Sequence, residues 1–304
     1  AWNNAPSSGA DSLVDSIIGA QSNRLILIFV LLAFAILVGP VNLFVFAPIG
    51  RRHRLFFTTP LIAIGTSLLL AIGVVISDGF GGTGTRVALV EIENTGDGHR
   101  AHIIQEQAAH LGIVFGTSFL LESGTSIRPF ESLETEFSQF SDEALASASF
   151  NLSTERVQDG IEASGDWFSS RSDVAQQLRN TRPGRGEVTV TANGDSLELS
   201  HSFNFNFDRI YYRDDDGELW TAEFVKTGTP ARLTKVKPSS WRDTMTGTRS
   251  LMSAATRKSF DSVIDRRGRF FGLSTDFPMI ETLDSIDWEE SRTLVTGTAK
   301  STNR

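Results

Sequence analysis

The apolar residues of this chain form two long uninterrupted runs near its start and short alternating stretches after residue 85. The runs cover residues 25–49 and 55–76 and contain no charged side chain. At about 1.5 Å per residue, helices of these lengths extend over roughly 37 and 33 Å, enough to cross a hydrocarbon core of about 30 Å. We therefore expect a two-helix transmembrane hairpin over residues 24–78.

The charges around the two runs predict an orientation. The connecting residues 50–54 contain Arg51, Arg52 and Arg54, whereas the outer flanks contain few basic residues. Because positively charged loops stay in the cytoplasm, these arginines determine a topology with a cytoplasmic loop at 50–54 and both chain ends outside. The alternatives are two buried helices of a soluble protein and a cleaved signal peptide. The absence of charged residues from both runs disfavours buried helices of a soluble protein. The presence of a second apolar run directly after the first disfavours a cleaved signal peptide.

Gly39, Pro40 and Asn42 mark an irregular point within the first run. Pro40 removes a backbone donor and Gly39 lets the chain bend, so we expect a kink in the helix. The Asn42 amide needs a partner in lipid, either a carbonyl freed by Pro40 or the second helix; the other interpretation is a polar site inside a membrane complex. With no ionisable group at depth, the hairpin is predicted to be an anchor or docking element.

The segments LVGPVNLFVF, GRRHRLFFTTPLI and TRVALVEI, within residues 37–92, resemble a group of uncharacterised bacterial inner-membrane proteins. In that family a Gly-Pro-Val-Asn transmembrane hairpin precedes an extracytoplasmic β-rich domain. The resemblance implies a multi-pass protein of the bacterial plasma (inner) membrane with its C-terminal domain outside the cytoplasm, and it implies no activity. Because such proteins often carry more sequence ahead of the hairpin and this chain begins at Ala1, we expect a fragment of a longer protein.

Two short segments flank the hairpin. Residues 1–23 are expected to form an extracytoplasmic linker and a short interfacial helix, because apolar residues between 13 and 18 fall at helical spacing. Residues 79–85 match the G-x-G-x-x-G dinucleotide fingerprint only formally, since that motif needs a strand before it and a helix after it. We expect a flexible glycine-rich linker there.

Residues 86–304 have a period-two pattern interrupted by turn residues, which predicts a mainly β, β-sandwich-like extracytoplasmic domain. Two hairpins are expected, one turning at Asn193-Gly194 and one joining residues 209–213 to 218–225. The first hairpin continues in one apolar face on every second residue, namely Leu197, Leu199, His201, Phe203, Phe205 and Phe207.

Short helical insertions are expected in the β pattern. The first runs from Asp166 to Arg179, with apolar residues at helical spacing. The second starts at Thr248 or Ser250 and extends to about Arg266. Both are predicted to pack on the sandwich.

Composition excludes some classes of partner and site. The 304 residues carry a net charge of −8, and residues 1–78 carry +1, so the β-rich remainder carries −9. An acidic domain binds nucleic acid poorly, so we expect no nucleic-acid partner, and the lipid bilayer and envelope proteins as partners. The chain has no cysteine, which excludes disulfides and thiolate sites.

No catalytic, cofactor-binding or metal site is predicted. The chain lacks the motifs of serine hydrolases, zinc hydrolases and phosphate-binding loops. His102 and His201 are interpreted as strand residues, and the acidic run at 214–217 lacks the full ligand set of a calcium loop. The basic run at 266–269 either complements the end of a helix or, if that end faces the bilayer, meets anionic lipid.

Three functions remain open. A membrane-anchored structural or interaction protein, whose β domain docks on other envelope components, accounts for the anchor and for the absence of catalytic motifs. A polymer- or substrate-binding accessory of an envelope export system requires an exposed groove with convergent aromatic residues. A hydrolase using paired carboxylates requires two facing carboxyl groups, and no spacing in the sequence selects such a pair. We expect the first function and no enzymatic activity.

Overall fold

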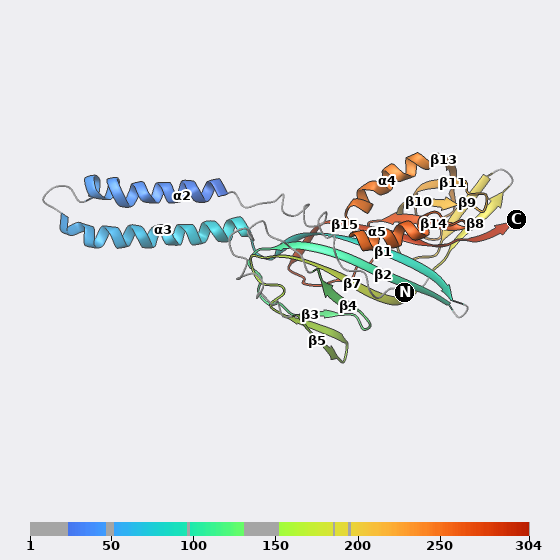
Figure 1. Ribbon diagram of the computed structural model, residues 1–304, viewed down its shortest axis with the longest axis horizontal. Helices are drawn as coiled ribbons and strands as arrows, with labels where there is room; N and C mark the ends of the chain where they lie inside the picture. The colour runs from blue at the N-terminus through green and yellow to red at the C-terminus, as the bar shows by residue number, and fades with distance from the viewer. Residues whose placement is uncertain are drawn as a thin grey trace.

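A set of apolar helices and a β-rich domain make up the part of the chain that the computed structural model describes (Figure 1). The expected linker and interfacial helix of residues 1–23 lie outside this part, as do Arg51 in the connecting loop and Gly194 at the first hairpin tip. The described residues are 24–46, 52–95, 98–130, 152–184, 186–193 and 196–303.

The apolar part is helical throughout its described residues, and Figure 1 shows α2 and α3 lying side by side and extending away from the β-rich domain. Its elements are α2 (Arg24–Ile36), the π-helical segment η1 (Leu37–Phe46), the single turn η2 (Arg52–Arg54) and α3 (Leu55–Asp78).

Pro40 lies inside η1, where the helix is wound more widely than an α-helix. A proline ring clashes with the carbonyl four residues earlier and has no N–H to donate, which accounts for the change of winding at this point. By length and composition, α3 contains one stretch able to cross a membrane, Leu55–Gly73, and the shorter apolar stretch Leu31–Val45 precedes it.

A nine-stranded mixed sheet forms the centre of the β-rich domain. Its strands lie in the order β13-β11-β10-β14-β15-β1-β2-β7-β4, with β1 and β15 parallel. The long antiparallel pair β1–β2 supplies the middle of the sheet. The strands are β1 (Gly82–Thr95), β2 (Gly98–Leu111), β4 (Ser126–Pro129), β7 (Asp173–Gly184), β10 (Phe207–Arg213), β11 (Leu219–Val225), β13 (Thr234–Val236), β14 (Arg269–Ser274) and β15 (Ile286–Thr298).

Two smaller sheets complete the described β structure. One has four strands in the order β12-β9-β8-β16, and the other has three in the order β3-β6-β5. The strands are β3 (Phe119–Leu121), β5 (Leu152–Val157), β6 (Gly160–Gly165), β8 (Val188–Asn193), β9 (Ser196–His201), β12 (Ala231–Arg232) and β16 (Lys300–Asn303).

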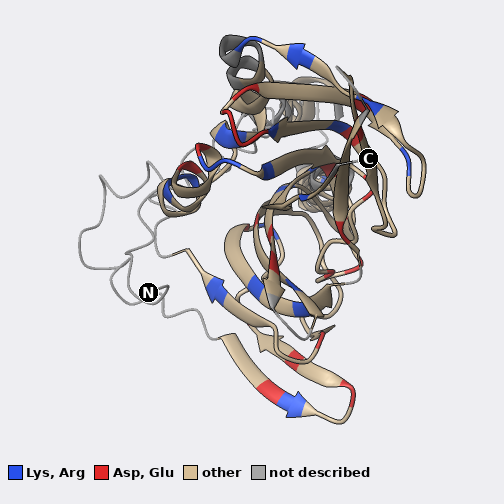
Figure 2. Ribbon diagram, turned by 90° about the vertical axis from the view of Figure 1, so that its right-hand side faces the viewer, with Lys and Arg blue, Asp and Glu red and all other residues tan. Residues whose placement is uncertain are grey.

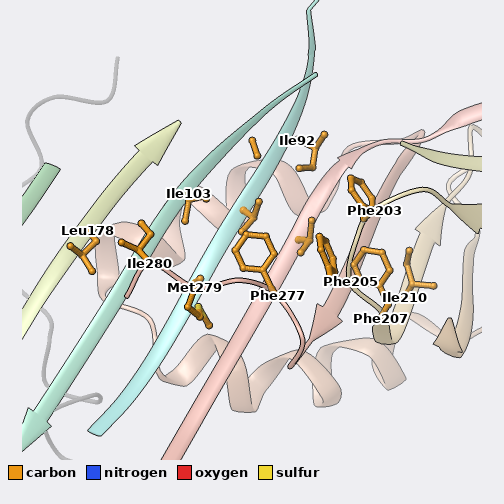
Figure 3. Close-up of a cluster of buried hydrophobic side chains, with 14 of the residues drawn as sticks. Ile92, Ile103, Leu178, Phe203, Phe205, Phe207, Ile210, Phe277, Met279 and Ile280 are labelled. Carbon is orange, nitrogen blue, oxygen red and sulfur yellow. The ribbon is translucent and has the colours of Figure 1, made fainter. Parts of the chain in front are cut away.

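The large sheet is covered on both faces. Val87 and Leu89 of β1 belong to a buried cluster that includes side chains of α4 (Pro238–Ser250) and α5 (Ala254–Ile264). The intervening residues of β1 belong to a second cluster, in which the phenylalanines of residues 203–207 lie over the sheet (Figure 3). The mainly β prediction is therefore confirmed, although helices cover one face of the large sheet.

Both expected hairpins are present. β8 pairs with β9 across the first turn, and β10 pairs with β11 across the second. Phe203, Phe205 and Phe207 are 3%, 6% and 1% exposed, which confirms that they share a buried side. They do not continue one strand, because β9 ends at His201 and β10 begins at Phe207.

The helix expected from Asp166 to Arg179 is wrong, because β7 begins at Asp173 and occupies the second half of this segment. β7 pairs with β2 along its length, and Val174, Ala175 and Leu178 are all buried. A strand buried on both faces loses the period-two signal, and a spacing of four between Val174 and Leu178 also matches a helix.

The second expected helix is correct only in its C-terminal part. The chain forms two helices, α4 and α5, with a break between Ser250 and Ala254. The Ser253 hydroxyl accepts a hydrogen bond from the Thr256 amide at 3.3 Å, so a new helix N-terminus begins here.

The glycine-rich segment after α3 is a hydrogen-bonded junction, which corrects the expected flexible linker at 79–85. β1 already begins at Gly82. Ile113 donates a backbone hydrogen bond to Gly79 (3.1 Å), and Gly81 donates one to Ile113 (2.9 Å). Gly81 has φ of 86°, and a Cβ there would collide with the Ser285 carbonyl oxygen, so this position requires glycine.

Replacing Phe205 by Asp is predicted to unfold the β-rich domain, because an unpaired buried carboxylate costs several kcal/mol against a total stability of about 5 to 15 kcal/mol. The matched control is Phe224→Asp, since Phe224 is 77% exposed. Thermal melts of a chain beginning at Gly79 compare the two, because all buried cluster residues lie after this point. A cooperative, parent-like melt of Phe205→Asp would contradict the assigned core.

Candidate functional site

Two adjoining hollows of about 700 and 670 Å³ lie beside α5, on the face of the large sheet that this helix covers. We call them together the distal groove. They share five lining residues, Glu91, His102, Ile104, Arg179 and Arg266. No Phe, Trp or Tyr is among the described residues that line either hollow, and the lining combines charged side chains with aliphatic ones such as Ile104 and Val263.

The floor of the groove is formed by residues of β1, β2 and β7, and the strand register places them in rows across the sheet. His102 of β2 lies opposite Glu91 of β1 and Thr181 of β7. The next row contains Ile104, opposite Arg179 of β7. Because residues two apart on a strand share a face, these rows present their side chains to the same side.

The wall of the groove is α5, and a buried carboxylate holds its start against the sheet. Glu106 of β2 is 0% exposed and accepts hydrogen bonds from the Ser253 amide (2.7 Å) and the Ser253 hydroxyl (2.5 Å). The Thr256 hydroxyl (2.6 Å) and the Gln177 side-chain amide (2.8 Å) also donate to it. A carboxylate at a helix N-terminus also interacts favourably with the helix dipole.

This attachment places one side of α5 over the floor. Lys258 and Ser262 are four residues apart on α5, a spacing that puts them on one face of the helix, and both line the second hollow. Arg266 follows two residues after the end of α5 and also lines this hollow. Glu106 was not predicted from the sequence, although it lies in a run of polar residues, Gln105 to Gln107, inside an otherwise apolar strand.

Basic groups outnumber acidic ones in the groove. Arg269 forms an ion pair with Glu91 at 2.8 Å, and both side chains are largely shielded from solvent. His102 lies 3.1 Å from the Glu93 carboxylate and 3.2 Å from the Thr181 hydroxyl. The lining cations are Arg179, Lys258, Arg266 and Arg269, against the carboxylates Glu91 and Glu93.

Both groove carboxylates thus have a basic partner, and they do not form the facing pair of free carboxyl groups that a hydrolase needs. Among the described residues, no cluster of three or more His, Asp or Glu has the arrangement of a metal site. The chemistry that the groove offers is recognition of an anionic group by guanidinium and ammonium side chains.

The basic run at 266–269 is divided between different contacts. Arg269 pairs with Glu91, and Arg267 donates to the Asp215 carbonyl at 3.0 Å. Glu91 is nine residues along β1 from Gly82, about 30 Å at the usual strand rise. The groove therefore lies far from the exit of α3, so if α3 spans a membrane, this position disfavours the alternative of lipid contact.

Figure 2, viewed from the end opposite the apolar helices, shows basic and acidic residues interspersed over the β-rich domain.

The residues predicted to shape the apolar helices lie in η1 and η2. Gly39 and Pro40 are inside η1, and Arg52 and Arg54 form the ends of η2. Asn42 is 0% exposed, and its side-chain amide donates to the Thr59 hydroxyl of α3 at 2.8 Å. This bond joins η1 to α3, one of the two partners that the sequence allowed.

In the acidic turn at 214–217, the Asp214 carboxylate accepts hydrogen bonds from within the same hairpin. One Asp214 carboxylate oxygen accepts from the Glu218 amide (2.8 Å), and the other accepts from the Trp220 indole (2.8 Å). Gly217 has φ of 89°, as a tight turn requires. Both carboxylate oxygens of Asp214 therefore serve the hairpin.

His201 is a buried strand residue with one hydrogen bond. Its Nε2 lies 3.1 Å from the Val225 carbonyl oxygen, so Nε2 carries the proton, while Nδ1 has no partner. Its ring contacts Phe203 and Phe207. Burial lowers the pKa of His201 below 6.5, and the hydrogen bond to Val225 opposes this effect only in part.

Comparisons with known proteins do not place the chain in a family. No family model matches it. No curated protein matches it. Among solved structures, the yeast delta-COP-I mu-homology domain complexed with a Dsl1 WxWxV peptide is 9% identical, and the alignment covers 74% of this chain and 98% of that one. Its TM-score of 0.28 is too low to support an argument about fold or function.

His201 predicts a loss of stability in mild acid. Because its folded pKa is lowered, the neutral ring stabilises the fold above about pH 6.5, and this contribution is lost as the pH falls through the folded pKa. The melting temperature of the parent should therefore fall more steeply between pH 7.5 and 5.5 than that of His201→Leu. Parallel pH profiles for the two proteins would contradict this assignment.

Proposed function

We propose that this chain is a membrane-anchored interaction protein of the bacterial cell envelope. In this proposal, the two apolar helices form a hairpin that spans the inner membrane, with Arg51, Arg52 and Arg54 in the cytoplasm. The β-rich domain then lies outside the cytoplasm and docks on other envelope components. The sequence resemblance supports the bacterial inner membrane as the location.

The exposure of α3 carries the proposal. Its candidate membrane-spanning stretch, Leu55–Gly73, is 0% buried against the rest of the protein. A helix that is apolar on all sides needs either a protein core or lipid around it, and here no core surrounds it. The most exposed apolar side chains of this stretch are Phe56, Phe57, Leu61, Ile64, Leu68 and Leu69.

The Asn42–Thr59 hydrogen bond also supports a hairpin. In lipid, a buried amide has no water to bind, so a hydroxyl on the neighbouring helix is a favourable partner. The bond links η1 to the first turns of α3 and would hold the two spans in one register.

A second candidate function is binding of an anionic envelope polymer or substrate, as an accessory of an export system. The distal groove favours this candidate because four cations line it in a domain that is acidic overall. The absence of aromatic residues from its described lining directs the candidate toward charged ligands and away from stacking on sugars.

The topology can be tested in spheroplasts because the chain has no cysteine. A membrane-impermeant maleimide should label Ser301→Cys directly and should label His53→Cys only after the membrane is made permeable, since the arginine-flanked loop stays in the cytoplasm. The control is the parent chain, which should not react. Immediate labelling of His53→Cys with protection of Ser301→Cys would reverse the proposed orientation.

The same two sites test what determines the orientation. Replacing Arg51, Arg52 and Arg54 together by Glu removes the retained charges, so both cysteines should then be labelled in part of the population. An unchanged labelling pattern would show that another segment determines the topology.

The polymer-binding candidate predicts that Arg266→Glu and Lys258→Glu weaken binding of fluorescent poly-L-glutamate by about tenfold, since a loss of about 1.4 kcal/mol has this effect. Arg232→Glu is the matched control, because it makes the same charge change at an exposed position in β12, outside the groove. Fluorescence anisotropy measures the affinity. Equal effects of all three variants would mean that net charge alone is responsible.

A further inference from the structure

Two exposed phenylalanines stack on each other where α3 joins the β-rich domain. Phe80 is 71% exposed and Phe115 is 82% exposed. Their ring centroids are 6.2 Å apart and their planes are inclined by 22°. Most other phenylalanines of the β-rich domain are buried, so this pair needs a separate explanation.

The pair is held at a fixed position relative to α3. Phe80 is the second residue after Asp78, the last residue of that helix. Phe115 is in the segment after β2, and Phe80 and Ile113 form a parallel β-bridge. The Gly112 amide donates to the Gly81 carbonyl at 2.7 Å, and the hydroxyl of Ser170 accepts from the Val114 amide at 3.0 Å.

The distance of Phe80 from the end of the apolar run indicates what surrounds the pair of rings. The apolar run ends at residue 76, four residues before Phe80, which is about 6 Å at the helical rise. The polar layer on each side of a bilayer is about 5 to 7 Å thick. If α3 spans the membrane, both rings therefore lie within the headgroup layer, next to the hydrocarbon boundary.

We propose that Phe80 and Phe115 form an interfacial anchor that inserts into the outer headgroup layer of the bilayer. This inference rests on the proposed membrane location of α3. The anchor adds a second point of lipid contact, contributed by the β-rich domain itself. Since the junction at Gly79–Gly82 is hydrogen-bonded to the domain, insertion of both rings would also restrict how the domain tilts on the membrane.

Spin labels on single cysteines can test this proposal in the full chain, reconstituted in vesicles of phosphatidylcholine and phosphatidylglycerol. The sites are Phe115→Cys at the pair, Gly65→Cys in the middle of α3 and Ser301→Cys on β16. A Cβ at Gly65 meets no atom within 4 Å, and Ser301 is exposed, so neither change disturbs packing. Collisions with lipid-soluble oxygen and with a water-soluble nickel chelate report the depth of each label.

The expected order is Gly65 deepest, Phe115 at the headgroup boundary and Ser301 in water. A label at 115 that collides with the nickel chelate as often as the label at 301 overturns the anchor, provided that the label at 65 is deep. A label at 65 that is open to the chelate overturns the membrane location itself. Protection of position 115 from both reagents would indicate a protein contact in place of lipid and would also overturn the proposal.

Discussion

Three consecutive polar residues in the middle of β2 hold both covering layers onto the large sheet. Glu106 points toward one face and binds the start of α5 through Ser253 and Thr256. Gln105 points toward the other face and exchanges two 2.8 Å hydrogen bonds with the backbone of Ile280. A buried carboxylate is costly unless donors surround it, and here hydroxyls, amides and a helix N-terminus do so. The groove exists in its present form because Glu106 fixes where α5 begins.

The second constraint is the direct passage from α3 into β1. In a chain with a flexible linker, the β-rich domain would move freely relative to the helices. Here Gly79 and Gly81 bond to Ile113, and Gly82 donates to the Ser285 carbonyl at 2.9 Å. The glycines at 81 and 82 allow close approach of two other backbone segments, so residues that suggested flexibility in the sequence create a tight contact.

The sequence predicted those features that depend on local pattern and failed where burial erased the pattern. The hairpins β8–β9 and β10–β11 were predictable because turn residues and alternation agree there. β7 was mistaken for a helix because the sheet buries both of its faces. The groove was not predictable, since Glu91, His102 and Arg179 come together only through the register of β1, β2 and β7. Long-range pairing of this kind leaves no trace in the spacing of residues along the chain.

The contacts of Glu106 with α5 and the junction between α3 and β1 together determine where the groove lies relative to the proposed membrane. The stiff β1–β2 pair begins at the exit of α3 and carries Glu91 and His102 about 30 Å further along the strand direction. A partner bound in the groove would then stand at a set height above the bilayer. A slip of β2 along β1 by one residue would move His102 by only about 3 Å, but it would turn His102 to the face opposite Glu91. Register, more than strand length, is therefore what the groove depends on.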